Sequence, residues 1–202
     1  MHIVKLFKNI FESFSRKIRV DNLICGIGES EIRENAIFIS NYPFEPSLAY
    51  PEKLIKASEI DAICIEFGAS KIRISDDIVF VSAEKKDQMK IFAERNNIPL
   101  SLYSWNWDWI LEPYLDTEFT EENKKLTTER LHENGLNTIE VDAIRKEIGK
   151  QMYRYNFDTM LWDWCSLSLQ DVLSAMRAKY NKEEFREFYK KAIEIENRKK
   201  QS

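Results

Sequence analysis

The first eighteen residues carry apolar side chains at helical spacing. They recur at steps of three and four residues, at Ile3, Phe7, Ile10, Phe14 and Ile18. This stripe predicts an amphipathic helix over residues 2–18. We expect its apolar face to pack on the protein's own core. Because its polar face is basic, peripheral attachment to a membrane surface is the alternative.

After this segment the apolar residues form short runs rich in Ile and Val, each bounded by turn-forming residues. The runs are DNLICGIG (21–28), AIFISNY (36–42), DAICIEFG (61–68), KIRIS (71–75) and DIVFVS (77–82). Runs of this length and composition predict β-strands. The last two flank Asp76-Asp77, and the first of them alternates apolar and polar residues, which predicts an antiparallel hairpin. We therefore expect one small antiparallel sheet.

Three segments beside these runs complete the N-terminal part. YPEKLIKAS (50–58) begins with Pro51 and is interpreted as a short helix with proline in its first turn. AEKKDQMKIFAERNN (83–97) predicts a helix that ends in asparagines before Pro99. IPLSLYS (98–104) is interpreted as one more strand.

From Trp105 onward the periodicity is helical. Residues 121–134 form a polar pattern that ends at Gly135, and a second helix is marked by apolar residues at Val141, Ile144, Ile148, Met152 and Tyr155. A further apolar face runs from Phe157 to Trp164. Ser168 with Asp171, and Asn181 with Glu184, have the spacing of capping boxes that begin the last two helices.

The patterns together predict an α+β fold. Residues 1–104 form an α+β region with an N-terminal helix, a small sheet and one or two helices, and residues 105–202 form an all-helical bundle. No flexible linker is visible near residue 104, so we expect the two regions to share one core, as a single domain or two closely joined ones.

The composition argues against several classes of protein. Five glycines and five prolines among 202 residues are too few for an all-β fold with many tight turns. The three cysteines, Cys25, Cys64 and Cys165, are odd in number and widely spaced, which argues against a disulfide framework and a zinc site. No run of about 18 apolar residues exists, and charges interrupt the apolar part of the first segment. A cytoplasmic protein is expected.

Charge is distributed unevenly, although the net charge is only −4. Residues 1–20 carry five basic and one acidic side chain, and residues 177–200 carry nine basic and five acidic ones. Residues 105–122 carry six acidic and no basic side chains. Because the acidic segment repels phosphate, we do not expect nucleic acid as its partner.

Residues for common enzymatic chemistry are scarce. The two histidines are His2, beside the first residue, and His132, which precedes the helix end at Gly135 and is expected at the surface. The cysteines fall in apolar runs, where free cysteine behaves as a small hydrophobic residue. Gly26 and Gly28 lack the third glycine of a dinucleotide-binding loop and the lysine of a P-loop. We therefore expect no enzymatic activity and no cofactor.

The acidic segment admits two interpretations. Its carboxylates are Asp108, Glu112, Asp116, Glu118, Glu121 and Glu122. As the alternative function, a hydrolase could bind Mg²⁺ or Mn²⁺ through Asp108, Glu112, Asp116, Asp158 and Asp163. Pro113, however, is expected to hold Glu112 extended, so that Asp108 and Glu112 are not one helical turn apart. Thr117 or Thr120 is expected to cap a helix whose first turn holds Glu118, Glu121 and Glu122.

Three of the five tryptophans, Trp105, Trp107 and Trp109, alternate immediately before these carboxylates. In an extended segment all three indoles would face one side, whereas a helix would spread them around its axis. We favour a non-enzymatic module that binds a basic protein partner, by analogy with immunity proteins and antitoxins. The candidate binding residues are Trp105, Trp107, Trp109, Asp116, Glu118, Glu121 and Glu122.

Overall fold

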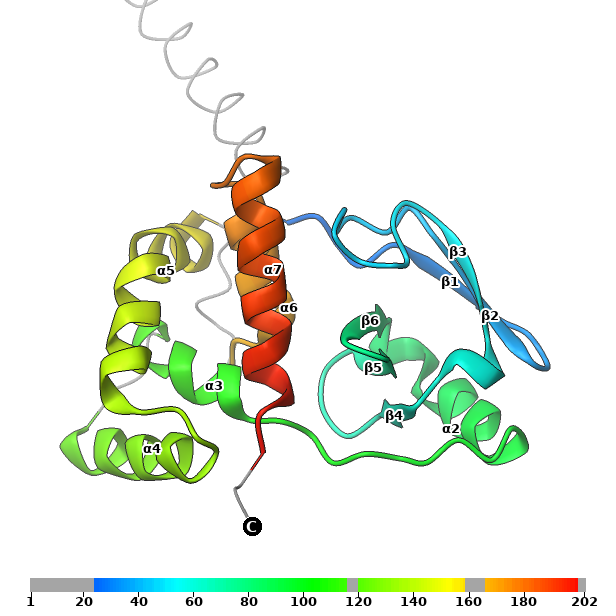
Figure 1. Cartoon of the computed structure of the whole chain (residues 1–202), viewed down its shortest axis with the longest axis horizontal. Coiled ribbons are helices and arrows are strands. Elements are labelled where there is room, and N and C mark those ends of the chain that lie inside the picture. The colour runs from blue at the N-terminus through cyan, green and yellow to red at the C-terminus, as the bar shows by residue number, and fades with distance from the viewer. Residues whose placement is uncertain (1–23, 116–119, 159–165, 200–202) are drawn as a thin grey trace, which may run out of the picture.

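The computed structural model describes residues 24–115, 120–158 and 166–199. Within them the fold is α+β, with two three-stranded antiparallel sheets in the N-terminal half and mostly helices in the C-terminal half (Figure 1). The helix predicted over residues 2–18 lies outside the described residues, and so does most of the apolar face predicted from Phe157 to Trp164.

The first sheet contains β1 (Glu29–Ile32), β2 (Ala36–Ser40) and β3 (Lys53–Lys56), in the order β1-β2-β3. The predicted strand AIFISNY is confirmed as the central β2, whose Ile37 and Ile39 are fully buried. The predicted strand DNLICGIG is wrong, since residues 24–28 have no regular structure and the strand begins at Glu29. Gly26 and Gly28 both have positive φ, and a Cβ on Gly28 would collide with the carbonyl oxygen of Ser40.

The helix predicted in YPEKLIKAS is also wrong. The segment forms β3 and then a short 3₁₀ helix, η1 (Ala57–Glu59). Ile55 pairs with Ile37 of β2 and is fully buried. Pairing with a buried strand therefore outweighed local helix preference, as happens when tertiary contacts decide an ambiguous short segment.

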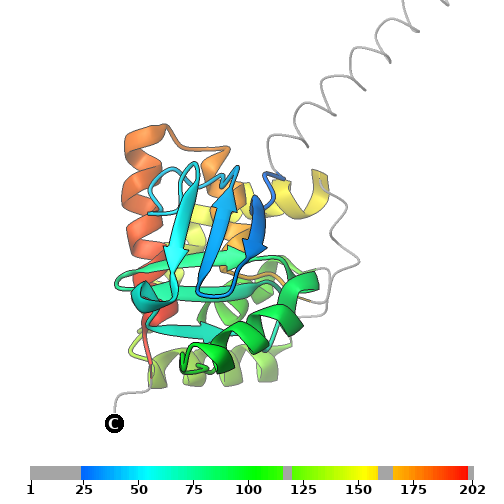
Figure 2. The same ribbon diagram turned by 90° about the vertical axis from the view of Figure 1, so that its right-hand side faces the viewer.

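The second sheet contains β4 (Ala62–Cys64), β5 (Ser70–Ile74) and β6 (Asp77–Val81), in the order β4-β5-β6. The predicted β5–β6 hairpin is confirmed, with Arg73 opposite Ile78. The expectation of a single sheet is wrong, because η1 separates β3 from β4 and the strands of the two sheets run in different directions (Figure 2).

The helix predicted over residues 83–97 is confirmed as η2 (Ala83–Lys85) followed by α2 (Lys86–Arg95). The strand predicted over residues 98–104 is reduced to a single bridge between Leu100 and Ile63 of β4. There Ile63 N donates to Pro99 O at 3.0 Å, and Ser101 N donates to Ile63 O at 2.9 Å. This extended segment leads the chain from the sheets to the helices.

The described helices of the C-terminal half are α3 (Asn106–Leu111), η3 (Glu112–Tyr114), α4 (Glu121–Glu133), α5 (Thr138–Asp158), α6 (Leu169–Arg177) and α7 (Lys182–Asn197). Three predicted helix starts are confirmed by capping, at Thr120, Ser168 and Asn181. The side chains of Thr120 and Asn181 accept hydrogen bonds from the N–H groups of Asn123 and Glu184. At Ser168 the Asp171 carboxylate accepts a hydrogen bond from the Ser168 N–H. These bonds satisfy backbone groups that lack a partner within the helix.

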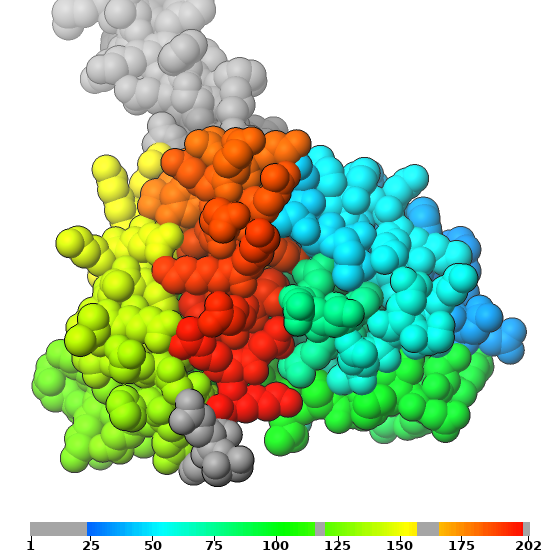
Figure 3. Space-filling model, viewed as in Figure 1, coloured from blue at the N-terminus to red at the C-terminus, as the bar shows by residue number. Residues whose placement is uncertain are grey.

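Helix α7 lies between the sheets and the other helices (Figures 1 and 3). On the sheet side, the Tyr189 hydroxyl donates to Asp77 at 2.7 Å. On the helical side, the Ala192 carbonyl accepts the Trp107 indole N–H at 2.9 Å. One continuous hydrophobic cluster contains buried residues from both sides of residue 104.

Candidate functional site

The three alternating tryptophans are separated by helix α3. Trp107 is fully buried in the core. Trp105, at the N-terminal end of α3, is 38% exposed, and Trp109 is half-buried one helical turn later. Because residues four apart share a face of a helix, Trp105 and Trp109 lie together and Trp107 points away from them.

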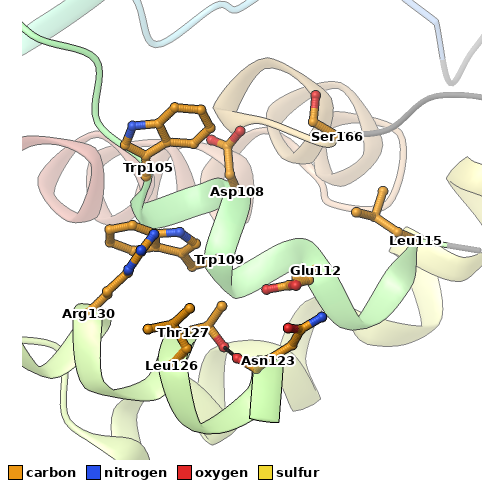
Figure 4. A pocket seen from close by; sticks show the side chains of 10 residues that line it. All are labelled: Trp105, Asp108, Trp109, Glu112, Leu115, Asn123, Leu126, Thr127, Arg130 and Ser166. Carbon is orange, nitrogen blue, oxygen red and sulfur yellow. Dashed lines mark hydrogen bonds between the residues drawn. The ribbon is translucent and has the colours of Figure 1, made fainter. Parts of the chain in front are cut away.

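Trp105 and Trp109 border a cleft of about 260 Å³ between α3 and α4, which we call the α3–α4 cleft (Figure 4). The carboxylates of Asp108 and Glu112 line it from the α3 side. Helix α4 contributes the opposite wall, with Asn123, Leu126, Thr127 and Arg130. The cleft therefore combines two indoles with two carboxylates on one helical face.

The prediction that Pro113 keeps Asp108 and Glu112 off a common helical turn is wrong. Glu112 has helical dihedral angles, φ −48° and ψ −39°, and begins the 3₁₀ helix η3. Proline is tolerated in the first turn of a helix because the backbone N–H that it lacks would have no partner there. The change from α3 to η3 at this point lets the chain stay helical through Pro113.

Asp108 is largely buried at the edge of the cleft. Its carboxylate accepts a hydrogen bond from the Tyr103 hydroxyl at 3.0 Å. Burial raises the pKa of Asp108 to about 7, the Tyr103 hydrogen bond and the Lys71 charge oppose this rise, and the Glu196 charge adds to it. Asp108 therefore changes charge in the neutral pH range.

Glu112 is a second carboxylate without an ion pair among the described residues. Burial raises its pKa, against the attraction of Arg145 and Arg130. Arg145 instead donates to the carbonyl oxygens of Trp109 and Ile110, at 3.0 and 3.1 Å. The Arg130 guanidinium lies over the Trp109 ring, 5.5 Å from its centroid (Figure 4).

Trp105 also belongs to a partly exposed group of rings, the aromatic wall, formed by Phe67, Tyr103 and Trp105. Its ring centroids are 4.8 to 5.3 Å apart. The Lys71 ammonium lies 3.9 Å from the Tyr103 centroid and pairs with Glu196 at 2.5 Å. Sequence reasoning missed Phe67, Tyr103, Lys71 and Glu196, because nothing in the local pattern shows that β5, residue 67 and α7 meet beside Trp105.

The remaining candidate residues are placed as follows. Glu121 and Glu122 are exposed in the first turn of α4 and do not line the cleft. Asp116, Glu118 and Asp163 lie outside the described residues, and the Asp158 side chain, at the end of α5, is not described either. Within the described residues no group of three or more His, Cys, Asp and Glu side chains is arranged to hold a metal ion.

The remaining predictions concern His132, the cysteines and membrane-spanning helices. His132 is exposed in the last turn of α4, where the sequence places it. Cys64 is buried in β4, whereas Cys25 is half-buried outside any strand, with its sulfur 3.4 Å from the Ser174 hydroxyl. Over the described ranges, no helix combines the length and the hydrophobicity needed to cross a membrane.

Comparisons with protein-family models, with curated proteins and with solved structures gave no match to this chain. The geometry of the cleft is therefore the basis for a functional assignment.

Proposed function

We propose that the protein is a binding module whose α3–α4 cleft takes an arginine or lysine side chain of a basic protein partner. The observation that carries this proposal is the open indole of Trp105 beside the carboxylates of Asp108 and Glu112, neither of which has an ion pair among the described residues. An aromatic face attracts a cation, and a carboxylate forms charge-assisted hydrogen bonds with it.

The contact of Arg130 with Trp109 supports this assignment. It shows a guanidinium over one indole of the same cleft, in the arrangement that we propose for the partner's cation over Trp105. Such contacts contribute about 0.5–1 kcal/mol at exposed sites and more where water is excluded. The carboxylates add the charge that selects a cation over a neutral side chain.

The effect of Asp108 ionisation on the stability of the fold is a second argument for the proposed function. The pKa of Asp108 is higher in the folded protein than in an unfolded chain, so the folded state binds more protons between about pH 4 and pH 7. Ionisation of Asp108 therefore lowers stability as the pH rises through this range. A carboxylate that destabilises the fold from a cleft is a candidate for a functional role, and a cationic ligand would add to the partial compensation that Lys71 supplies.

Binding of an arginine peptide is expected to depend on pH through Asp108. The affinity for an N-acetylated tetra-arginine peptide should rise about tenfold from pH 6 to pH 8, because the ionised fraction of a group with a pKa near 7 rises by about that factor. Guanidinium stays charged throughout. Asp108→Asn should bind at pH 8 about as weakly as the native protein binds at pH 6. Isothermal titration calorimetry at constant ionic strength measures this.

A matched charge change on the same surface provides the control. Glu129 is exposed on α4, pairs with Lys125 and does not line the cleft, so Glu129→Gln should keep both the affinity and its pH dependence. The proposal fails if Asp108→Asn and Glu129→Gln behave alike, or if the native protein does not bind the peptide at pH 8.

A further inference from the structure

A second, larger cavity adjoins the α3–α4 cleft. Its volume is about 480 Å³, and we call it the inner cavity. It shares Trp105, Asp108 and Ser166 with the cleft, so the two spaces meet along these three residues. A partner segment that places one side chain in the cleft therefore has a neighbouring space for another.

The walls of the inner cavity are mostly apolar. The aromatic wall borders one side, and Ile27, Ala69 and Phe80 contribute aliphatic and aromatic surface. Phe67 is 49% exposed although it contacts both Tyr103 and Trp105. Polar residues such as Ser82, Ser168 and Gln170 are interspersed with this surface, and a largely apolar lining with polar groups is typical of a preformed ligand site.

The charged groups at this cavity, other than Asp108, already have partners. Lys71 pairs with Glu196 and lies over the Tyr103 ring. Asp171 accepts hydrogen bonds from Tyr155 and from the Ser168 backbone N–H and hydroxyl, at 3.1, 2.8 and 2.9 Å. Glu196 neutralises Lys71, and three hydrogen bonds from the protein occupy the Asp171 carboxylate, so neither group is free to recognise a charged ligand.

Polar groups with free hydrogen-bonding capacity remain at the rim. No hydrogen bond within the described residues engages the Gln170 side-chain amide, and Ser166 is exposed. Both residues line the cavity. A suitable occupant is therefore an uncharged ring with one hydrogen-bonding group at its edge, a combination that tyrosine provides.

We infer that the inner cavity binds an aromatic side chain with a polar edge, such as tyrosine, next to the basic residue held in the α3–α4 cleft. This inference rests on the proposed function and specifies its partner: a basic segment in which arginine or lysine has an aromatic neighbour. The aromatic residue stacks on the aromatic wall, and its hydroxyl reaches Gln170 or Ser166.

Capped peptides test the inference. Each peptide carries one arginine and one tyrosine, adjacent or separated by one or two glycines and in both orders, and its partner peptide has alanine in place of tyrosine. At the best spacing, tyrosine should tighten binding about three- to tenfold over alanine, the range expected for one aromatic contact. Phenylalanine should give a smaller gain, because it leaves the polar rim without a partner.

Two variants locate the contact. Phe67→Ala removes one ring of the aromatic wall and should abolish the gain from tyrosine while keeping the affinity for the arginine–alanine peptide. Leu54→Ala, at a similarly exposed apolar residue in β3, should keep the gain. Thermal unfolding of both variants checks that each is folded.

The outcomes separate the two proposals. This inference is overturned if the tyrosine and alanine peptides bind equally, or if the gain from tyrosine persists in Phe67→Ala. Neither result contradicts the proposed function. Binding of neither peptide by the native protein overturns both.

Discussion

Replacing Glu196 by alanine is expected to lower the free energy of unfolding by about 3–5 kcal/mol at neutral pH. The side chains of Lys71 and Glu196 are only 10% and 2% exposed, and their charged atoms are 2.5 Å apart. Burial raises the pKa of Glu196 and offsets much of what Lys71 contributes, so the intact pair adds little net stability. Loss of the carboxylate leaves a buried ammonium group without its partner, which is the costly state.

Denaturation in urea measures the effect, and Lys191→Ala is the control. Lys191 lies on the same helix and pairs with Glu147 at 2.8 Å, but both side chains are partly exposed, at 41% and 32%. Its loss should cost about 1 kcal/mol or less. The double variant Lys71→Met/Glu196→Leu should recover most of the lost stability, since it leaves no buried charge. A Glu196→Ala cost as small as that of Lys191→Ala contradicts the buried-pair account.

Replacing Trp107 by alanine is expected to cost about 3–5 kcal/mol of unfolding free energy. The side chain is fully buried and packs against Phe188, with ring centroids 6.4 Å apart. Its indole N–H donates to the Ala192 carbonyl, so truncation removes a hydrogen bond as well as volume. Trp107→Phe keeps most of the volume and should cost less, which provides a folded variant if the alanine variant does not fold.

Trp105→Ala gives the opposite pattern. Trp105 is 38% exposed, so its loss should cost little stability but should weaken binding of the arginine peptide at least severalfold. Chemical denaturation and calorimetry on the same samples separate the two effects. If Trp105→Ala destabilises the protein as much as Trp107→Ala, the division of the tryptophans into core and cleft is wrong.

The sequence predicted elements well where local chemistry decides them. Thr120 and Asn181 begin helices because their side chains accept hydrogen bonds from N-terminal N–H groups, and at Ser168 the Asp171 carboxylate bonds the Ser168 N–H. These contacts depend only on neighbouring residues. The β5–β6 hairpin likewise follows from alternation around a turn. Such features need no knowledge of distant parts of the chain.

Predictions failed where distant contacts or competing local rules decided. Residues 53–56 form a strand because β2 offers a pairing edge, which the local sequence does not reveal. Residues 24–28 have strand-like composition, but Gly26 and Gly28 adopt positive φ. A residue before proline usually adopts an extended conformation. Glu112 is helical instead, because Pro113 lies in the first turn of η3, where proline is tolerated.

The candidate site was predicted only in part. The sequence singled out Trp105 and Trp109 as candidate binding residues, and Asp108 and Glu112 only as metal ligands of the alternative hydrolase. Phe67 and Tyr103 come from other segments, and Arg130 comes from α4, so only the fold brings them to the site. An extended segment would have placed all three indoles on one surface. Residues 106–111 are helical instead, so Trp107 is buried and only Trp105 and Trp109 line the cleft.

The most direct test of the proposed cleft is a titration of the ¹⁵N-labelled protein with the tetra-arginine peptide, followed through the indole N–H signals and assigned with single Trp→Phe variants. The signals of Trp105 and Trp109 should shift in a saturable way with one affinity, while that of Trp107, hydrogen-bonded to Ala192 in the core, should stay in place. Saturable shifts elsewhere in the protein, with Trp105 and Trp109 unmoved, would contradict the assignment of the α3–α4 cleft as the binding site.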